Sequence, residues 1–466
     1  MSSLVTRLTS DVTNIQNAVS TGMRPFGRSP VMLIFATSFA FRINSTLALV
    51  FLVALPTLAV LLILIIINVG PLYGRMQSAI DQVNRCIQEN LTAIRVVKSY
   101  VRGDYEVEKF GVVNENLKSE SEKAFGTAVL NMPAMQFVMY GTILGILLIG
   151  GRLINEGQMM IGQLTSFLSY VLLILNSLMM MSNVFLLMTR SLASAERIME
   201  VIDEKIDITD ENAKDIAVAK GEIEFDHVWF KYKDTAKEYV LSDVSFHIKP
   251  GQTVGIIGQT GSSKTTLVQL IPRLYDVTKG EVKIDGINVK EYPVRHLRDA
   301  VAMVLQKNTL FSGSLIDNLR WGNENATLDE IKEACQIACV DEFVDRLADG
   351  YDTEMGQEGV NVSGGQKQRI CIARAILKKP KVLILDDSTS AVDTATEAKI
   401  RIGLAEKLPD MTKIIIAQRI SSVRHADQII IMDRGHVEAI GTHESLLRDN
   451  QIYQEIYASQ KEGADL

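Results

Sequence analysis

Long stretches without a charged residue are the feature that most restricts what this chain can fold into. They cover residues 43–74, 124–151 and 157–189. Each is longer than the roughly 20 apolar residues that a helix needs to cross a bilayer. From Gly221 onward charged residues are mixed throughout, as in a domain that faces water. The sequence therefore predicts an α-helical membrane domain followed by a cytosolic domain.

The apolar stretches predict four membrane spans. The first is the weakest, because Arg24 and Arg28 lie in its first half. Long cationic side chains there can reach the headgroups, or the helix can continue into the cytoplasm. The predicted spans are residues 21–41, 46–68, about 127–150 and about 160–187.

The polar stretch of residues 75–123 separates the second span from the third. It has eight lysines and arginines and no proline, which favours long helical extensions with a break near residues 100–105. Because positive charge concentrates in this stretch, we expect it to be cytoplasmic and the short turns to be outside. Four spans then return the chain to the cytoplasm. The predicted domains are a membrane domain at 1–200, a linker at 201–220 and a nucleotide-binding domain at 221–460.

A glycine-rich loop lies between a predicted buried strand at 253–257 and a predicted helix at 265–274. Small residues let backbone N–H groups close around phosphate oxygens, while Lys264 supplies a positive charge and the Thr265 hydroxyl suits Mg²⁺. The loop consists of Gly258, Gln259, Thr260, Gly261, Ser262, Ser263, Lys264, Thr265 and Thr266.

A second strand-like segment, residues 381–387, supports this interpretation. It is aliphatic and brings in Asp386, which would hold Mg²⁺ through water. A glycine-rich loop alone is as often a tight turn as a phosphate site, but the strand, the Lys-Thr pair and Asp386 together favour a nucleoside triphosphate. The loop departs from the P-loop pattern at Ser263, where the pattern has glycine. Serine is small, so we expect binding to survive.

Further motifs lie before and after the glycine-rich loop and residues 381–387. Residues 221–232 alternate like strands and end in aromatic residues, and an exposed aromatic there could stack on adenine. After the loop come Gln306, then the signature Ser363-Gly364-Gly365-Gln366, then Ser390-Ala391-Val392-Asp393, then Gln418. With these motifs the sequence resembles the ATP-binding cassette (ABC) exporters. The resemblance covers nearly the whole chain, and the signature between the loop and the second strand is highly specific.

The resemblance implies roles for individual residues. Tyr232 matches the aromatic that stacks on adenine, and Gln306 matches the residue that links Mg²⁺ to the membrane domain. The implied metal set is thus Thr265, Gln306 and Asp386. Ser363, Gly364, Gly365 and Gln366 would open a helix whose N-terminus faces the γ-phosphate of ATP held by another subunit.

Two residues depart from the ABC exporter pattern at positions where catalysis of ATP hydrolysis is expected. The resemblance implies that Asp387, Gln418 and Gln306 are the catalytic residues, yet active members carry glutamate at the position of Asp387. Its shorter side chain misplaces the carboxylate by about 1 Å, which can reduce the rate about 10²-fold. Members also carry a histidine at the position of Gln418, and glutamine cannot become positively charged. Either both are tolerated variants, or hydrolysis at this site is slow or absent.

The resemblance also implies how the chain assembles. We expect it to be one subunit of an exporter dimer in the cell membrane, with a different partner chain that carries the glutamate and the histidine. A short coupling helix at the tip of residues 75–123 would dock on the partner's nucleotide-binding domain. Exporters of this kind usually have six spans, so the first two are missing here. The chain is then a fragment or truncated product, or another polypeptide supplies those spans.

The substrate is less constrained by the sequence. Residues 179–181 are three methionines, which either line a pliable cavity or fill apolar space. We expect a small amphipathic or drug-like substrate. The net charge of −7 gives no reason to expect nucleic acid. Two alternatives remain: a homodimeric exporter with two slow ATP sites, and a regulatory subunit that binds ATP but does not transport.

Overall fold

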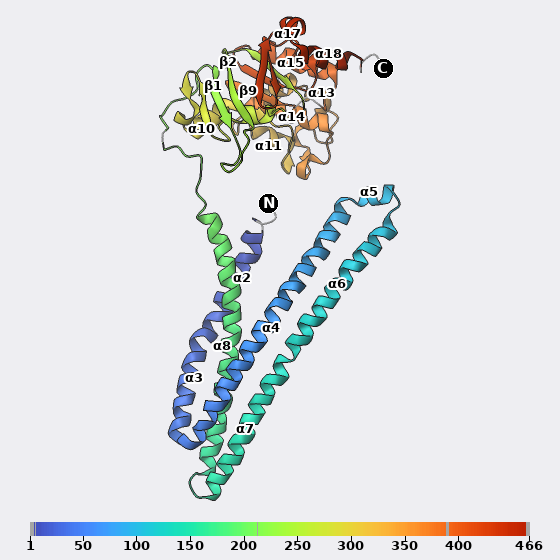
Figure 1. Cartoon of the computed structure of the whole chain (residues 1–466). Coiled ribbons are helices and arrows are strands. Elements are labelled where there is room, and N and C mark those ends of the chain that lie inside the picture. Colours follow the sequence, from blue (N-terminus) through green and yellow to red (C-terminus); the bar gives the residue numbers. More distant parts are fainter. Residues whose placement is uncertain (1–3, 5, 212, 388–390, 463–466) are drawn as a thin grey trace. The chain divides into compact units, whose positions relative to one another are not determined.

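The computed structural model describes residue 4 and residues 6–211, 213–387 and 391–462. The chain forms two units, Met1–Lys205 and Ile206–Leu466. The first is helical and the second combines helices with sheets (Figure 1).

The helical unit begins with three short helical segments and continues mainly as long helices. Its core is made by α3, α4, α7 and α8, where Phe51 of α4 stacks on Phe167 of α8 at 5.4 Å between ring centroids. Asn44 alone separates α3 from α4, and its side chain accepts a hydrogen bond from Leu47 N at 2.9 Å, which caps α4. The elements are η1 (Arg7–Asp11), α2 (Val12–Asn17), η2 (Ala18–Gly22), α3 (Met23–Ile43), α4 (Ser45–Thr92), α5 (Ile94–Ser99), α6 (Gly103–Val129), α7 (Asn131–Asn155) and α8 (Ile161–Ile202).

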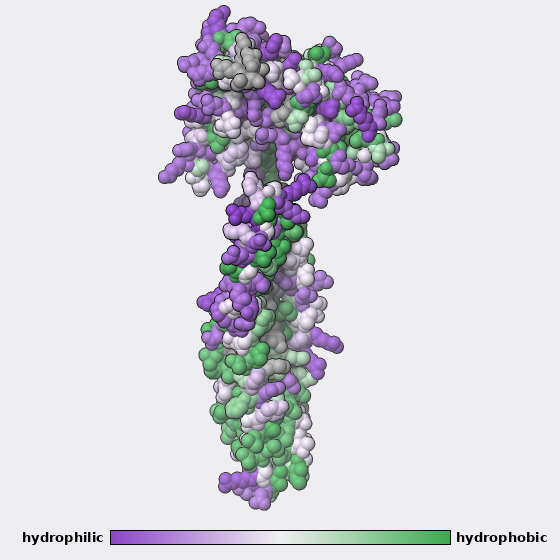
Figure 2. All heavy atoms as spheres, turned by 90° about the vertical axis from the view of Figure 1, so that its right-hand side faces the viewer, coloured by the Kyte–Doolittle hydropathy of each residue, from purple (hydrophilic) through white to green (hydrophobic). Residues whose placement is uncertain are grey.

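The apolar surface of this unit gathers at one end. Figure 2 shows hydrophobic side chains over the half that holds the α3–α4 and α7–α8 turns. Within the described residues, Gln136–Asn155 and Ile161–Met181 are long and apolar enough to cross a membrane, and Ser45–Leu61 of α4 is a shorter apolar helical stretch. The first predicted span begins at the end of η2 and continues through most of α3. The count of four spans remains a prediction.

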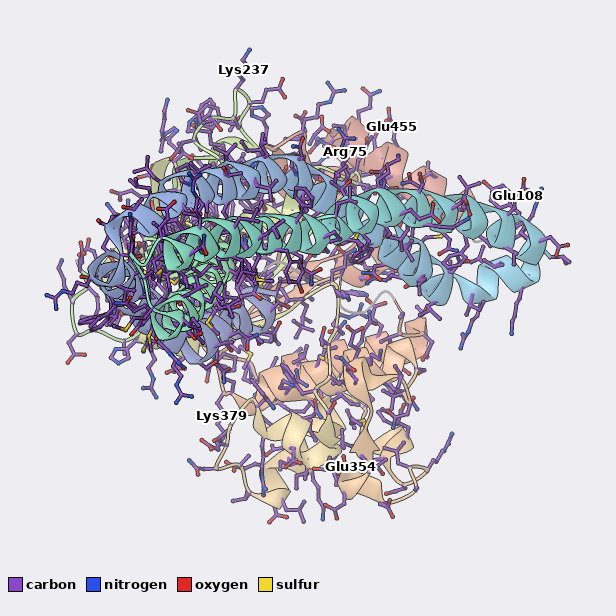
Figure 3. The ribbon with its side chains drawn as sticks, turned by 90° about the horizontal axis from the view of Figure 1, so that it is seen from below. Arg75, Glu108, Lys237, Glu354, Lys379 and Glu455 are labelled. Carbon is purple, nitrogen blue, oxygen red and sulfur yellow. The ribbon has the colours of Figure 1, made fainter. Side chains whose placement is uncertain are left out.

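The predicted break in the polar stretch falls at the expected place. Helices α4 and α6 run side by side, and α5 lies at their end (Figure 1). Val101, between α5 and α6, has a positive φ of 54°, which stops the helix. Charged side chains such as Arg75 and Glu108 cover the two arms (Figure 3).

The second unit contains a mostly parallel sheet and an antiparallel sheet. The strand order of the first is β12-β11-β3-β10-β9-β6, and only β12 runs antiparallel to its neighbour. The order of the second is β2-β1-β4-β5. The strands are β1 (Ile223–Phe230), β2 (Leu241–Ile248), β3 (Thr253–Gly258), β4 (Lys279–Ile284), β5 (Ile287–Asn288), β6 (Val301–Val304), β7 (Gly313–Ser314), β8 (Glu354–Met355), β9 (Val382–Asp386), β10 (Thr412–Ile416), β11 (Gln428–Asp433) and β12 (His436–Gly441).

Buried strands explain the aliphatic runs of the sequence. Every residue of β9 and of β10 is buried, as expected for central strands of a parallel sheet covered on both faces. The helices are α9 (Lys264–Gln269), η3 (Val289–Glu291), α10 (Val294–Ala300), α11 (Leu315–Arg320), α12 (Leu328–Ile337), α13 (Asp341–Val344), η4 (Gly350–Asp352), η5 (Gln357–Gly359), α14 (Gly364–Leu377), α15 (Thr394–Lys407), α16 (Ile420–Val423), α17 (His443–Asp449) and α18 (Gln451–Glu462).

One boundary differs from the sequence prediction. The helix after the glycine-rich loop was expected over residues 265–274, but α9 ends at Gln269. Pro272 has no N–H with which to continue the helical hydrogen bonds, and Arg273 adopts a positive φ of 50°. The chain therefore leaves the helix five residues earlier than predicted, at Gln269 instead of residue 274, and bends.

Candidate nucleotide site

Four neighbouring parallel strands bring the predicted site residues to one edge of the sheet. The glycine-rich loop follows β3, Asp386 ends β9, Gln418 lies two residues after β10, and Gln306 lies two residues after β6. Because the strands are parallel, their carboxyl ends meet at the same edge, where α/β proteins bind ligands. Residues that are far apart in the sequence thus converge.

The glycine-rich loop is wrapped around the Lys264 ammonium. Its Nζ donates to the Gly258 carbonyl at 2.9 Å, to the Gln259 carbonyl at 2.8 Å and to Ser262 Oγ at 3.1 Å. Burial lowers the pKa of Lys264, while the nearby carboxylates of Asp387 and Asp386 oppose this shift. The cation is therefore held at the mouth of the loop, where a phosphate would meet it. Thr260 is exposed in the same loop.

Ser263 stands where the chain needs an unusual backbone conformation. It caps α9 with a φ of 71°, in the left-handed region, and Gly261 has a φ of 86°. Glycine adopts this region freely, whereas a residue with a Cβ costs about 1–2 kcal/mol there. The departure at Ser263 therefore adds strain to the loop, but the loop still closes.

The predicted metal pair is in direct contact. Thr265 Oγ1 donates to Asp386 Oδ1 at 3.1 Å. Asp386 is 2% exposed, its other oxygen has no hydrogen-bond partner in the described part of the chain, and burial raises its pKa. A buried carboxylate oxygen without a partner beside a hydroxyl suits Mg²⁺ or a water bound to it. Gln306, the third predicted member of the metal set, contacts Asp387 instead.

Asp387 lies at the centre of a small hydrogen-bonded cluster. The Gln418 amide donates to Asp387 Oδ2 at 2.7 Å, and the Gln306 amide donates to the same oxygen at 3.4 Å. Asp387 has a positive φ of 48° and is buried. Burial raises its pKa, while the hydrogen bonds from Gln418 and Gln306 act in the opposite direction. The three predicted catalytic residues thus meet, but they bond to one another.

The signature opens a helix, as predicted. Ser363 caps α14: its side chain accepts from Gln366 N at 3.3 Å, and the Gln366 side chain accepts from Ser363 N at 2.8 Å. Gly364 is exposed, whereas a Cβ on Gly365 would lie 2.7 Å from the Ala391 carbonyl oxygen. Within the described part of the chain, the N–H groups of Gly364 and Gly365 have no hydrogen-bond partner, and such groups at a helix N-terminus can bind an anion. Ser390, beside Ala391, lies outside the described residues.

Tyr232 lies beside the loop, and the structure adds a neighbour that the sequence did not indicate. Its hydroxyl and Thr266 Oγ1 share a hydrogen bond of 2.9 Å, and the residue is 50% exposed. Tyr275, in the bend after α9, lies 5.1 Å from it between ring centroids. No spacing rule relates Tyr275 to Tyr232, because the bend that joins them depends on Pro272 and Arg273.

Comparisons with known families match both units. The ABC transporter transmembrane region matches residues 1–178, and the ABC transporter family matches residues 241–390. The uncharacterized ABC transporter ATP-binding protein YfiB of Bacillus subtilis is 40% identical over 100% of this chain and 81% of that protein.

Relatives with more specific names, and a solved structure, extend the match. The putative multidrug export ATP-binding/permease protein YgaD of Bacillus subtilis is 34% identical over 98% of this chain and 79% of its own length. The ATP-dependent lipid A-core flippase of Pseudomonas putida is 34% identical over 98% of this chain and 75% of its own length. The structure of a bacterial Atm1-family ABC exporter with ATP bound superimposes with a TM-score of 0.86 at 25% identity, over 98% of this chain and 80% of that chain.

Proposed function

This chain belongs to the ABC transporter family, as an exporter with its transmembrane region and ATPase domain on one polypeptide, and we propose that it is the slow-hydrolysing subunit of an asymmetric dimer. Its ATPase is coupled to transport. The proposed partner is a different chain with the glutamate and the histidine that are replaced here. Together they would export a small amphipathic substrate across the cytoplasmic membrane.

The hydrogen bond between Gln418 and Asp387 is the observation that carries this proposal. A general base must be free to accept a proton from the attacking water, and a switch residue must reach the phosphate. Here the short Asp387 side chain accepts from Gln418 at 2.7 Å and from Gln306 at 3.4 Å. Asp387, in the position of the base, and Gln418, in the position of the switch residue, are therefore hydrogen-bonded to each other. In addition, Gln418 has no positive charge with which to attract the γ-phosphate.

Binding of ATP does not need those two groups. Backbone N–H groups of the loop and Lys264 would hold the phosphates, Tyr232 would stack on adenine, and Thr265 with Asp386 would hold Mg²⁺. The metal would neutralise charge on the β- and γ-phosphates when bound. We therefore propose that this chain keeps its ATP in place while hydrolysis proceeds at the other site.

The signature of this chain would serve the partner. Ser363 and Gln366 form a complete cap, and Gly364 is exposed at the first turn of α14. An exposed helix N-terminus is a place where an anion is stabilised by the helix dipole and free N–H groups. We propose that it closes on the γ-phosphate of the ATP that the partner's loop holds.

Coupling would run through α5 and the residues that follow it. Tyr100 is 75% exposed and Val101 is 88% exposed, although the arms around them are polar. The ATPase unit has a cavity of about 310 Å³ whose lining includes Phe311 and Trp321, stacked at 4.2 Å. The two exposed apolar residues of the tip can pack against the two stacked aromatic rings of the groove, so we propose that the tip of one subunit docks in this groove of the other.

The class of substrate rests on the relatives. One is named for multidrug export and another for flipping a lipid. Both names fit a substrate that partitions into the bilayer, and the apolar surface of the helical unit would meet such a molecule. We propose an amphipathic substrate on these grounds.

Replacing Lys264 with alanine tests the asymmetry. Labelling of this chain by azido-ATP should fall at least tenfold, because the loop loses its only cation. Phosphate release by the assembled transporter should keep a measurable part of its rate, since the partner's site does the chemistry. Lys407→Ala, an exposed lysine at the end of α15, is the matched control and should change neither readout.

Two outcomes would count against the proposal. Complete loss of turnover in Lys264→Ala would mean that both sites must hydrolyse, as in a homodimer. Steady turnover by the chain purified without a partner would point to the same arrangement. If the chain binds ATP but no complex that contains it transports, the regulatory alternative is favoured instead.

A further inference from the structure

Two aromatic rings stand nearly perpendicular to the half-exposed ring of Tyr232. The Tyr275 ring lies 5.1 Å away between centroids at an interplanar angle of 88°, and the Phe230 ring lies 4.9 Å away at 81°. Edge-to-face pairs are the favoured geometry for aromatic rings. Because both neighbours stand nearly perpendicular to it, they restrict the plane of the Tyr232 ring, and half of the residue remains exposed for a base to stack on.

The bend that contains Tyr275 is held by several hydrogen bonds. The buried Arg273 side chain pairs with Asp276 at 2.9 Å, and Arg298 donates to the carbonyls of Pro272 at 3.2 Å and Arg273 at 2.8 Å. The bend that carries Tyr275 is therefore bonded on both sides of the tyrosine. A residue with this support can impose its position on a more exposed neighbour.

The segment that contains Tyr232 is also hydrogen-bonded to the chain just after this bend. Lys231 N donates to Thr278 Oγ1 at 3.2 Å, and Thr278 N donates to the Trp229 carbonyl at 2.9 Å. On its other side the Tyr232 hydroxyl bonds Thr266 in α9, the helix that the glycine-rich loop opens. The ring is thus fixed relative to the loop that would hold the phosphates.

We propose that Tyr275 is a positioning residue for adenine recognition: it holds the Tyr232 ring in the plane in which the base stacks. This inference rests on the proposed adenine role of Tyr232. Tyr275 then contributes to the binding of the base and not to the binding of the phosphates. Its contribution is the ring, because an edge-to-face contact needs no hydroxyl.

The test compares a ligand with a base and one without. The full-length chain in lipid nanodiscs is titrated with ATP and with inorganic tripolyphosphate, for the wild type, Tyr275→Ala, Tyr275→Phe and Tyr232→Ala. Tyr275→Ala should weaken ATP about threefold to tenfold, the range for losing one aromatic pair. Tyr275→Phe should stay within about twofold of the wild type, since the ring remains. Tripolyphosphate should bind all four proteins alike.

The possible results separate this inference from the function on which it rests. If Tyr232→Ala leaves ATP binding unchanged, the adenine role of Tyr232 is wrong. If Tyr232→Ala weakens ATP but Tyr275→Ala does not, the adenine role stands and the positioning role is wrong. A loss of tripolyphosphate binding in Tyr275→Ala would show that the bend supports the whole loop, which also overturns the inference. Failure of Tyr275→Phe to restore ATP binding would do so as well.

Discussion

Replacing Gly364 with glutamate should lower the ATP turnover of the assembled transporter at least tenfold, which corresponds to about 1.4 kcal/mol or more of activation free energy. The new carboxylate would sit at the exposed N-terminus of α14, where we propose that the partner's γ-phosphate binds. It would repel the phosphate and take its place at the free N–H groups. The loss should appear in steady-state phosphate release at saturating ATP.

The structure explains why Gly364 is the better of the two glycines for this experiment. Among the residues that the structure describes, a Cβ on Gly364 would have the Ala391 side chain alone within 4 Å, at 3.5 Å, so we expect this chain to fold with a larger residue there. A Cβ on Gly365 would meet the Ala391 carbonyl at 2.7 Å, so a substitution there disturbs the fold. Gly364→Gln has the size of glutamate without its charge, and a smaller loss in that variant would identify the repulsion.

The matched measurement is Asp387→Asn with the same partner and the same ATP concentration. Asparagine keeps the shape of the side chain and removes a carboxylate that Gln418 already engages at 2.7 Å. The transporter should therefore keep most of its turnover. The order of the two effects is decisive: if Asp387→Asn is more damaging than Gly364→Glu, Asp387 is a working base and the proposed asymmetry is wrong.

Exchanging residues 100–104 for a flexible glycine-serine linker should abolish transport while basal ATPase persists. The exchange removes Tyr100 and Val101, the exposed apolar residues at the tip, and the first residues of α6. Closure of the ATPase domains would then no longer be passed to the membrane helices. Transport into inverted vesicles and substrate stimulation of ATPase should both disappear.

Single substitutions on the arms provide the control for this exchange. Leu91 is 71% exposed in α4 and Val107 is 72% exposed in α6, so each matches the tip residues in exposure and apolar character. Changing either to serine should leave coupling intact, because neither lies at the tip. Transport that survives the exchange of residues 100–104 would refute the role of the tip.

Sequence reasoning located those parts of the site that follow from strand order and local pattern. The aliphatic runs before Lys264 and up to Asp386 predict buried strands, whose ends meet at one edge of a parallel sheet, whereas Gln306 and Gln418 are identified through the resemblance to ABC exporters. The resemblance also implies that Ser363 to Gln366 open a helix, and the capping box that Ser363 and Gln366 form at the start of α14 agrees with it. These predictions needed no knowledge of distant contacts.

The remaining features depend on contacts that no local pattern encodes. The hydrogen bond between Gln418 and Asp387 joins residues that follow two different strands, β10 and β9. Its length depends on the conformation of the chain after each strand. The early end of α9 follows from Pro272 and the positive φ of Arg273, and it is this bend that brings Tyr275 to Tyr232. The apolar pattern of α3 is interrupted by arginines, so the number of spans cannot be read from hydropathy alone.

The turn at Asn44 has a practical consequence for work on intact cells. One residue connects α3 to α4, and residues 156–160 connect α7 to α8. If this end faces outward as the charge distribution predicts, these turns offer a protease or an antibody almost no loop to bind. Reporter tags would have to be inserted at residues 156–160, since lengthening the Asn44 turn would break the cap that starts α4. Antibody labelling at either of these two turns without such a tag should therefore fail.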